Sequence, residues 1–210
     1  MTRQQVLRAA IEVADRDGIE AVTMRRLGQE LGVEAMSLYH HVPSKDALLD
    51  GIVDVVIGEI AVPTETAAWR SAVHGRAMTA RAHVRRHPWV TGLITSRRGL
   101  RPAMLRYMDW VVGVLTDGGF SRELIHSAIH LLGARLFGFN EETFSEGIQP
   151  EDAQPLRALL GTGEYQAIAQ AMKGMHHDDD HEFAFGLDLI LDGLERARDA
   201  PADRAPILDS

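Results

Sequence analysis

The sequence predicts an all-α fold in which a small N-terminal unit of three helices precedes a larger helical domain. Apolar residues recur three or four positions apart along most of the chain, which is the spacing of one helix face. Threonine, serine, glycine and proline residues that cap or stop helices bracket these segments. No segment shows the alternation of polar and apolar residues that is typical of a half-buried strand. The 210 residues, 45% of them apolar, suffice for a sizeable core.

Four helices are expected in the first sixty residues. Each is bounded by a residue whose side chain caps a helix, or by a glycine or proline that ends one. The boundaries are, in order, the capping box of Thr2 and Gln5, Gly18, Thr23, the turn Gly32-Val33, Pro43 and Ser44. The short third helix covers about residues 34–40, and the long amphipathic fourth helix covers about 45–61.

Five further helices are expected in the rest of the chain. They cover about residues 67–87, 100–115, 121–136, 164–173 and 182–198. Pro63 and residues 64–66 form the connection before them, and an acidic loop is expected at 141–155. The sequence therefore predicts a domain at 1–46, joined through helix 45–61 to a second domain at 47–199, and a disordered tail at 200–210.

The net charge of −8 lies entirely outside the first 45 residues, which hold six basic and six acidic side chains. Such a neutral unit can bind DNA when its cations share one face. The chain has no cysteine, and it shows neither a signal-peptide core nor an apolar run of membrane-spanning length. We therefore expect a cytoplasmic protein with no membrane partner.

The segment from Thr23 to Val42 carries the clearest motif. Two short helices flank a glycine-containing turn, which is the geometry of a helix-turn-helix. In such a pair the second helix enters the major groove of DNA. Its outward side chains can meet base edges, thymine methyl groups and phosphates, and they are Ala35, Met36, Ser37, Tyr39 and His40.

The residues from Arg3 to about Ile60 resemble the DNA-binding domain of TetR-family repressors. The shared pattern is Gly18, Thr23-Met24-Arg25-Arg26-Leu27, Leu31-Gly32-Val33, Leu38-Tyr39-x-His41-Val42 and Lys45-x-x-Leu48-Leu49. The rest of the chain resembles the C-terminal domain of the tetracycline-repressor subgroup. Its markers are His87-Pro88-Trp89, Gly118-Gly119-Phe120-Ser121 and Phe183-Ala184-Phe185-Gly186-Leu187.

This resemblance implies a homodimeric repressor that binds a palindromic double-stranded DNA operator and is released by a small organic inducer. It implies that Thr23 and Lys45 meet phosphates, that Arg25 reads a base and that Tyr39 and His40 clamp the DNA backbone. The full set of implied DNA contacts is Thr23, Met24, Arg25, Ala35, Met36, Ser37, Tyr39, His40 and Lys45. No cofactor is implied.

The C-terminal domain is expected to form both a dimer interface and a ligand pocket. Two apolar stripes suit a four-helix bundle between protomers. They are Ile125, Ile129, Leu132 and Leu136, and Phe183, Leu187, Ile190, Leu191 and Leu194. Adaptable apolar and amphipathic side chains suit a pocket, and the candidates are Trp89, Ile94, Met104, Met108, His130 and Phe137.

One departure from the tetracycline repressors bears on the inducer. Those repressors hold the magnesium ion of the drug with a histidine shortly after the segment that corresponds to His87-Pro88-Trp89. Ile94 stands at that place in this sequence, and isoleucine offers no lone pair to a hard cation. We therefore expect an uncharged or amphipathic organic inducer rather than magnesium–tetracycline.

Two charged segments have more than one interpretation. Nine arginines and no acid lie between Trp69 and Met108, which favours a solvated face over an anion-binding surface. The expected partners of that face are acids elsewhere, such as Glu141, Glu142, Glu151 and Asp152. The segment from His176 to His181 resembles a metal cluster. Consecutive ligands in a loop rarely converge, however, so no metal site is expected.

Other classes of function fit less well. No nucleophile elbow, phosphate loop or zinc-protease motif is present, so an enzyme is not expected. A helix-turn-helix architectural protein that binds DNA without responding to a ligand stays as the alternative. A sizeable apolar cavity in the C-terminal domain would favour the ligand-released repressor, because a protein without a ligand should have a filled core.

Overall fold

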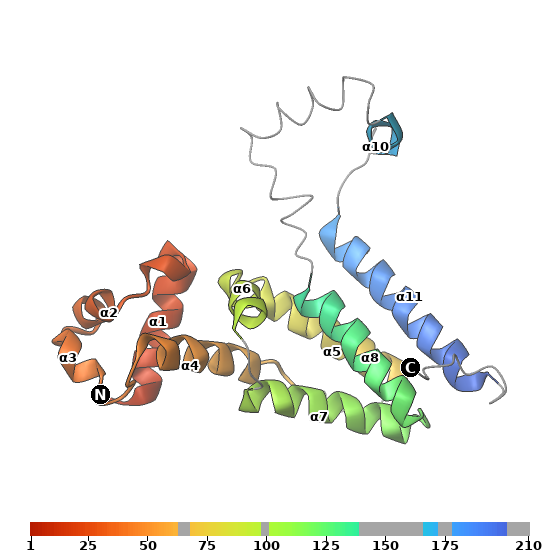
Figure 1. Ribbon diagram of the computed structural model, residues 1–210, viewed down its shortest axis with the longest axis horizontal. Coiled ribbons are helices and arrows are strands. Elements are labelled where there is room, and N and C mark those ends of the chain that lie inside the picture. The colour runs from red at the N-terminus through yellow and green to blue at the C-terminus, as the bar shows by residue number, and fades with distance from the viewer. Residues whose placement is uncertain (63–67, 98–100, 139–165, 172–177, 201–210) are drawn as a thin grey trace, which may run out of the picture.

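The computed structural model describes residues 1–62, 68–97, 101–138, 166–171 and 178–200, and all regular structure within these ranges is helical (Figure 1). The elements are α1 (Arg3–Asp17), the 3-10 turn η1 (Ile19–Ala21), α2 (Met24–Leu31), α3 (Ala35–Leu38), α4 (Lys45–Gly58), α5 (Trp69–Val84), α6 (Trp89–Ser96), α7 (Pro102–Asp117), α8 (Arg122–Phe137), α10 (Gln166–Ala171) and α11 (Asp179–Asp199). Within the same ranges, no helix combines the length and the apolar character that crossing a membrane takes.

The N-terminal helix boundaries follow the capping residues. The backbone amide of Gln5 donates to the Thr2 hydroxyl at 3.2 Å, and the Thr2 amide donates to the Gln5 side chain at 2.7 Å, so the expected capping box is confirmed. Thr23 and Ser44 cap α2 and α4 with their side chains, and Gly18 ends α1. The sequence therefore predicted the start of each of these helices correctly.

A close backbone approach holds α2 and α3 together. Leu27 and Leu38 are fully buried between them, in the same core as Leu7 of α1. A Cβ atom at Gly28 would lie 2.8 Å from the backbone oxygen of Val33, so only glycine allows the chain to pass this close. The turn that follows α2 thus depends on the absence of a side chain at this position.

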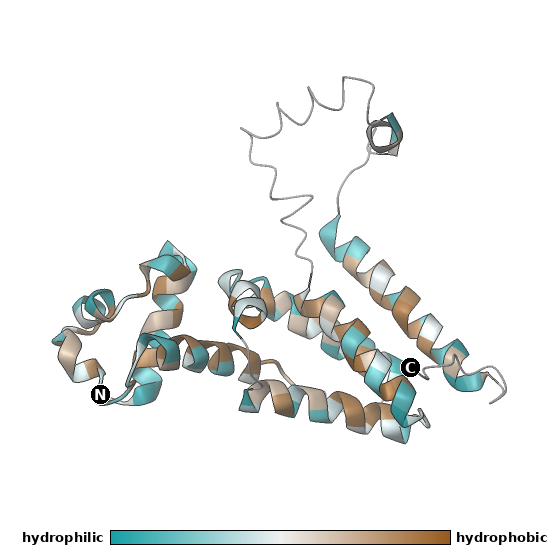
Figure 2. Ribbon diagram, in the orientation of Figure 1, coloured by the Kyte–Doolittle hydropathy of each residue, from teal (hydrophilic) through white to brown (hydrophobic). Residues whose placement is uncertain are grey.

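Helix α4 leads from the N-terminal helices into the larger helical domain (Figure 1). It contacts α1, α6 and α7, and hydrophobic residues follow it along most of its length (Figure 2). Its buried residues are Leu48, Leu49, Gly51, Ile52, Val53, Val56 and Ile57. One continuous apolar core therefore extends from α1 through α4 to Val90 of α6 and Ala103 of α7.

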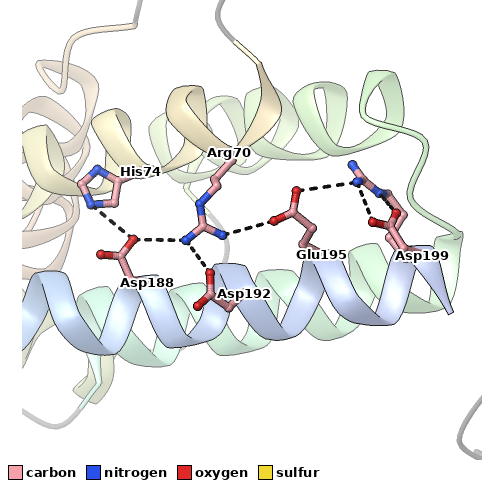
Figure 3. Close-up of polar contacts among 7 residues, drawn as sticks. Arg70, His74, Asp188, Asp192, Glu195 and Asp199 are labelled. Carbon is pink, nitrogen blue, oxygen red and sulfur yellow. Dashed lines mark hydrogen bonds and ion pairs between the residues drawn. The ribbon is translucent and has the colours of Figure 1, made fainter.

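The larger domain has a second core among α5, α7, α8 and α11. Leu115 of α7 and Leu191 of α11 are fully buried in it. Ion pairs join α5 to α11 at its edge (Figure 3). Arg70 lies 2.6 Å from Asp192 and 3.4 Å from Asp188. These side chains are partly exposed, so they align the two helices while the buried apolar residues supply most of the stability.

Several elements differ from the expected spans. Helix α6 was not expected, because Pro88 was interpreted only as a stop for α5. Proline also suits the start of a helix, since its φ is already helical and the first amides need no partner within the helix. The third helix is shorter than expected, and α11 begins at Asp179, because Asp178 caps it by accepting from the amide of His181. The expected connection at 63–66, the loop at 141–155 and the tail beyond residue 200 lie outside the described residues.

The glycine at position 28 gives the first prediction. Gly28→Ala should lower the free energy of unfolding by about 1–3 kcal/mol, because its methyl group would overlap a backbone oxygen that cannot move freely. Gly75→Ala is the matched control. Its Cβ meets nothing within 4 Å, so this change should raise stability by about 0.5–1 kcal/mol. Urea denaturation at one fixed protein concentration measures both, and equal effects would contradict the close-approach argument.

Candidate DNA-binding surface and ligand pocket

The outer face of α3 and the start of α4 form an exposed surface beside the turn. Met36 is 71% exposed and Tyr39 is 41% exposed, while His40 and Lys45 are also exposed. A large apolar side chain that projects into solvent from a short helix suits contact with thymine methyl groups. The exposed set therefore combines one apolar, one aromatic and two basic or ionisable side chains.

Two adjacent arginines on α2 have different surroundings. Arg26 forms ion pairs with Asp17 at 3.3 Å and with Glu30 at 3.0 Å. Arg25 is exposed and forms no ion pair with a described residue. A guanidinium that is already held by two carboxylates is a poor donor to a base, so the geometry favours Arg25 as the side chain that is available to DNA.

Other predicted contact residues are partly occupied within the protein. The Thr23 hydroxyl accepts from the Arg26 amide at 3.1 Å, and the Ser37 hydroxyl donates to the Glu34 carbonyl at 2.7 Å. Met24 is 9% exposed, and Ala35 is half-buried against the core. These residues shape the ends of the two helices, whereas the most accessible predicted contacts are Arg25, Met36, Tyr39, His40 and Lys45.

A cavity of about 90 Å³ lies among α5, α7, α8 and α11. Three of the six predicted pocket residues line it, namely Met104, Met108 and Phe137. The remainder of the lining is Val73, Ala77, Tyr107, Val111, Ile129, Leu132, Gly133, Arg135, Leu136, Phe183 and Leu187. The described lining is thus almost wholly apolar, with one tyrosine hydroxyl and one guanidinium as its polar groups.

The other three predicted pocket residues lie outside this lining. Trp89 donates from its indole nitrogen to Asp15 at 2.7 Å, and so it joins the α5–α6 corner to α1. Ile94 packs against the core that the buried residues of α1 and α4 form together. His130 is exposed, and its ring meets that of His126, one turn earlier in α8, edge to face. The sequence could not show which way these three side chains point.

Acidic residues of α4 contact the C-terminal end of α6 and the N-terminal end of α7. Asp50 accepts from Nε of Arg97 and from Nη2 of Arg101, each at 2.9 Å. Asp54 accepts from the backbone amide of Ala103 at 2.7 Å and so caps the start of α7. The hydrogen bond from Arg97 lowers the pKa of the Asp50 carboxyl below its usual value. Asp50 therefore stays ionised over the neutral pH range.

The arginine-rich segment is mainly a paired face, as the sequence indicates, and its described partners are acids of α4 and α11. Arg70 pairs with acids of α11, Arg81 pairs with Asp180 at 3.2 Å, and Arg97 pairs with acids of α4. The expected partners at 141, 142, 151 and 152 lie outside the described residues. Hydrogen bonds from Arg81 lower the pKa of Asp180. Asp180, which lies in the segment from His176 to His181 that resembles a metal cluster, is thus part of an ion pair. Among the described residues, no group of three metal-ligating side chains lies together.

The two stripes predicted for the dimer interface face the inside of the protomer. Phe183, Leu187, Leu191 and Leu194 are at most 4% exposed, and Ile125 is 9% exposed. Ile129, Leu132 and Leu136 are partly buried against the cavity, and Ile190 is partly buried beside the same core. The reason is that α8 and α11 contact each other within the protomer, which occupies their most apolar faces. Their exposed apolar residues are Leu131, Phe185 and Leu189.

Four residues that the sequence did not single out have central positions. Asp15 receives hydrogen bonds from Trp89 and stands 2.9 Å from Nδ1 of His87. Tyr107 and Arg135 line the cavity, and Arg76 is 3% exposed beside it. An isolated acid or arginine on an amphipathic helix has the same local pattern as a solvated residue, so nothing in the sequence distinguished these four.

Comparison with known proteins identifies the family. The family model "Bacterial regulatory proteins, tetR family" matches residues 6–52, and the model "Tetracyclin repressor-like, C-terminal domain" matches residues 62–198. The chain belongs to the TetR family. It is therefore a transcriptional regulator and not an enzyme, which confirms the interpretation of the helix-turn-helix segment.

Two curated relatives of this TetR-family regulator are named as repressors. The chain is 32% identical over 209 residues to the HTH-type transcriptional repressor DrrR1 of Streptomyces coeruleorubidus, and the match covers 93% of this chain and 77% of that protein. It is 36% identical over 211 residues to the class A tetracycline repressor protein from transposon 1721 of Escherichia coli, covering 94% of each.

Solved structures show the same architecture. Apo ActR from Streptomyces coelicolor superposes with a TM-score of 0.78 at 28% identity, covering 94% of this chain and 96% of that one. ActR in complex with actinorhodin gives a TM-score of 0.78 at 27% identity, covering 95% and 99%. The predicted arrangement of an N-terminal helix-turn-helix and a C-terminal helical domain is therefore confirmed.

The contact between α1 and the α5–α6 corner gives the second prediction. Asp15→Ala should lower the free energy of unfolding by about 1–3 kcal/mol, because the buried indole nitrogen of Trp89 would lose its acceptor. Asp17→Ala is the matched control. Asp17 is about as exposed but pairs only with Arg16 and Arg26, so its loss should cost about 0–1 kcal/mol. Denaturation followed by tryptophan fluorescence measures both, and equal losses would exclude a special role for Asp15.

Proposed function

We propose that this regulator is a homodimeric repressor that binds a palindromic operator and leaves it when a small organic molecule enters the C-terminal domain. The observation that carries the proposal is the exposed surface on α3 and the start of α4, which a buried leucine core holds rigidly. Phosphate contacts position such a surface on DNA, and contacts to base edges select the sequence. Acting on chromosomal DNA, the repressor works in the cytoplasm.

Individual roles follow from exposure and chemistry. Arg25 reads a base edge, with guanine as the best match for a planar guanidinium. Residues 35–37 lie at the groove-facing end of α3, with Met36 placed for thymine methyl groups. Tyr39, His40 and Lys45 hold the DNA backbone, and Thr23 adds a phosphate contact at the start of α2. Met24 contributes by packing, since it is buried.

The domain division follows from the packing of α4. A DNA-binding domain at 1–46 is linked through the helix at 45–61 to a ligand-binding and dimerisation domain at 47–199. The two family matches, to residues 6–52 and 62–198, support a boundary within this linking helix. Helix α4 packs on α1 of the DNA-binding domain and on α6 and α7 of the larger domain. A conformational change in the larger domain therefore reaches the recognition surface through α4.

The exposed faces of α8 and α11 form the dimer interface. Leu131 is 49% exposed, Phe185 60% and Leu189 54%, and these side chains lie on the sides of the helices that face away from the protomer core. Two helices from each protomer make a four-helix bundle with two-fold symmetry. The bundle buries these apolar side chains and places the two recognition surfaces symmetrically.

A ligand-released repressor is favoured over a ligand-independent architectural protein by the solved complex of ActR with actinorhodin, and not by the size of the cavity. Its volume of about 90 Å³ is smaller than the ~150 Å³ that holds a benzene ring in an apolar interior. A larger ligand must therefore move α7 relative to α8 or α11. Helix α7 also packs on α4, so ligand entry and DNA release are coupled through that contact.

Magnesium–tetracycline does not fit this pocket. No carboxylate and no imidazole lies in the described lining, and Ile94 packs elsewhere. Magnesium prefers oxygen ligands, which an apolar lining does not supply. An organic molecule that is mainly apolar suits the lining better. ActR, which shares the fold, has been solved in complex with actinorhodin.

The DNA-binding roles give the third prediction. With an operator duplex selected from genomic DNA, Arg25→Ala should cost about 1–3 kcal/mol and relax discrimination at one base pair. Arg26→Ala is its matched control and should cost less, because that guanidinium is already paired. Lys45→Ala should weaken binding to all sequences and reduce the salt slope by about one unit. Fluorescence anisotropy measures each. Operator affinity that is unchanged in Arg25→Ala and Lys45→Ala would refute these roles.

The dimer interface gives the fourth prediction. Phe185→Glu combined with Leu189→Glu should give folded monomers, because the charges would lie where the second protomer packs. Leu105→Glu changes a leucine of similar exposure on α7 and should leave the dimer intact. Leu187→Glu with Leu194→Glu should instead unfold the protein, since both side chains are buried. Sedimentation and circular dichroism separate these outcomes, and a dimeric Phe185/Leu189 variant would disprove the interface.

A further inference from the structure

The cavity contains donors without partners, and these bear on the chemistry of its ligand. Arg135 reaches the lining from the last turn of α8. Its Nη2 donates to the backbone oxygen of Glu182 at 2.6 Å, which fixes the guanidinium against α11. Its Nε is buried and has no hydrogen-bond partner among the described residues. One N–H group is therefore held in place beside the cavity and is unused.

The guanidinium of Arg135 is closely confined. Its central carbon lies 4.9 Å from the ring centre of Phe183. A Cβ atom at Gly186 would lie 3.0 Å from both Nε and the central carbon, so glycine makes room for the group. Ring stacking on one side and helix backbone on the other restrict its rotation. A guanidinium donor that is fixed in this way forms a stronger hydrogen bond to an anionic oxygen than to a neutral acceptor such as water.

A second buried arginine adds to the positive character of the same region. Arg76 lies 4.5 Å from the ring centre of Tyr107 and 4.4 Å from that of Trp110, and it is 3% exposed. Its Nε and Nη1 have no hydrogen-bond partner within the described part of the chain. The described lining of the cavity includes no acid. One guanidinium therefore lines the mostly apolar cavity, a second packs on the ring of the lining residue Tyr107, and no carboxylate lies in the described lining.

Tyr107 supplies a further donor. It lines the cavity between Arg76 and Phe137, with its ring 6.4 Å from the Phe137 ring. Burial raises the pKa of Tyr107 to about 12, so its hydroxyl keeps its proton at neutral pH. All the polar groups at the cavity can therefore donate a hydrogen bond.

We propose that the inducer is a planar aromatic acid, whose anionic oxygen accepts from Nε of Arg135 and whose rings lie among the methionine and phenylalanine side chains. The proposal rests on the proposed function, because it names the ligand class of the same pocket. The apolar lining binds the rings through Met104, Met108 and Phe137. The arginines select the anion, because a buried unpaired donor favours a ligand that supplies an acceptor.

Matched pairs of probe molecules test directly whether the pocket prefers a negatively charged ligand. The pairs are 2-naphthoate with 2-naphthamide, and anthracene-2-carboxylate with its carboxamide, which share shape but differ in charge. Calorimetric titration of the full-length protein should show at least tenfold tighter binding of the carboxylate in one pair or both. Equal binding within both pairs, or no binding of either carboxylate, would overturn the proposal without any variant being needed.

Two variants test whether the carboxylate preference depends on Arg135. Arg135→Met should reduce the carboxylate preference to less than twofold, while Arg122→Met, an exposed arginine on the same helix, should keep it. If Arg135 only holds α11 through Glu182, its replacement lowers the melting temperature and leaves the preference intact, which refutes the assignment. Should Arg135→Met fail to fold, Tyr107→Phe provides the second variant, with an expected loss of about threefold for the carboxylate.

Operator binding separates this proposal from the proposed function. Anisotropy without any probe measures whether the wild-type protein binds DNA. Absence of operator binding would refute the repressor, whatever the probes do. Intact operator binding without a carboxylate preference would refute only the acidic ligand. Release of the operator by the carboxylate and not by the amide of a pair is the result that supports both.

Discussion

The structure depends on helix α4 being packed on two sides. Its apolar residues belong to the core that begins at α1 and continues into α6 and α7. Its acids accept hydrogen bonds from Arg97, from Arg101 and from the backbone amide of Ala103 at the start of α7. A helix with buried faces on both sides cannot shift relative to one domain without disturbing the other, because protein interiors are close-packed. Communication between the cavity and the recognition surface is a consequence of this packing.

The charged side chains differ between the edges of the helix packing and its interior. Carboxylates of α4 and α11 satisfy most of the arginines whose partners are described, and they do so at the edges of the helix packing. Arg76 and Arg135 differ, because they are placed inside the second core with N–H groups unpaired among the described residues. An apolar core tolerates such groups at a cost of about 1–3 kcal/mol for each unpaired donor.

The amphipathic patterns of α8 and α11 show where sequence-based prediction is limited. The strongest apolar stripe of each helix was assigned to the dimer interface, yet Leu187 and Leu191 lie in the protomer core. A helix at a dimer interface buries two faces, and the inner face needs the larger apolar content because it is surrounded on more sides. The second face, with Phe185 and Leu189, is weaker and overlaps a charged pattern. Hydropathy alone ranks the two faces but does not say what covers each.

The sequence by itself determined the all-helical fold, the family and the starts of α1, α2 and α4, because capping residues, glycine turns and apolar spacing act locally. It also indicated the exposed residues of the recognition surface, since α3 is too short to bury more than Leu38 fully. Only the tertiary structure decided which side chains line the cavity, and that Trp89 contacts α1 while Arg135 reaches the pocket. The hydrogen bonds of Trp89 and Arg135 join residues 74 and 47 positions apart, and their geometry is set by how the helices pack on one another.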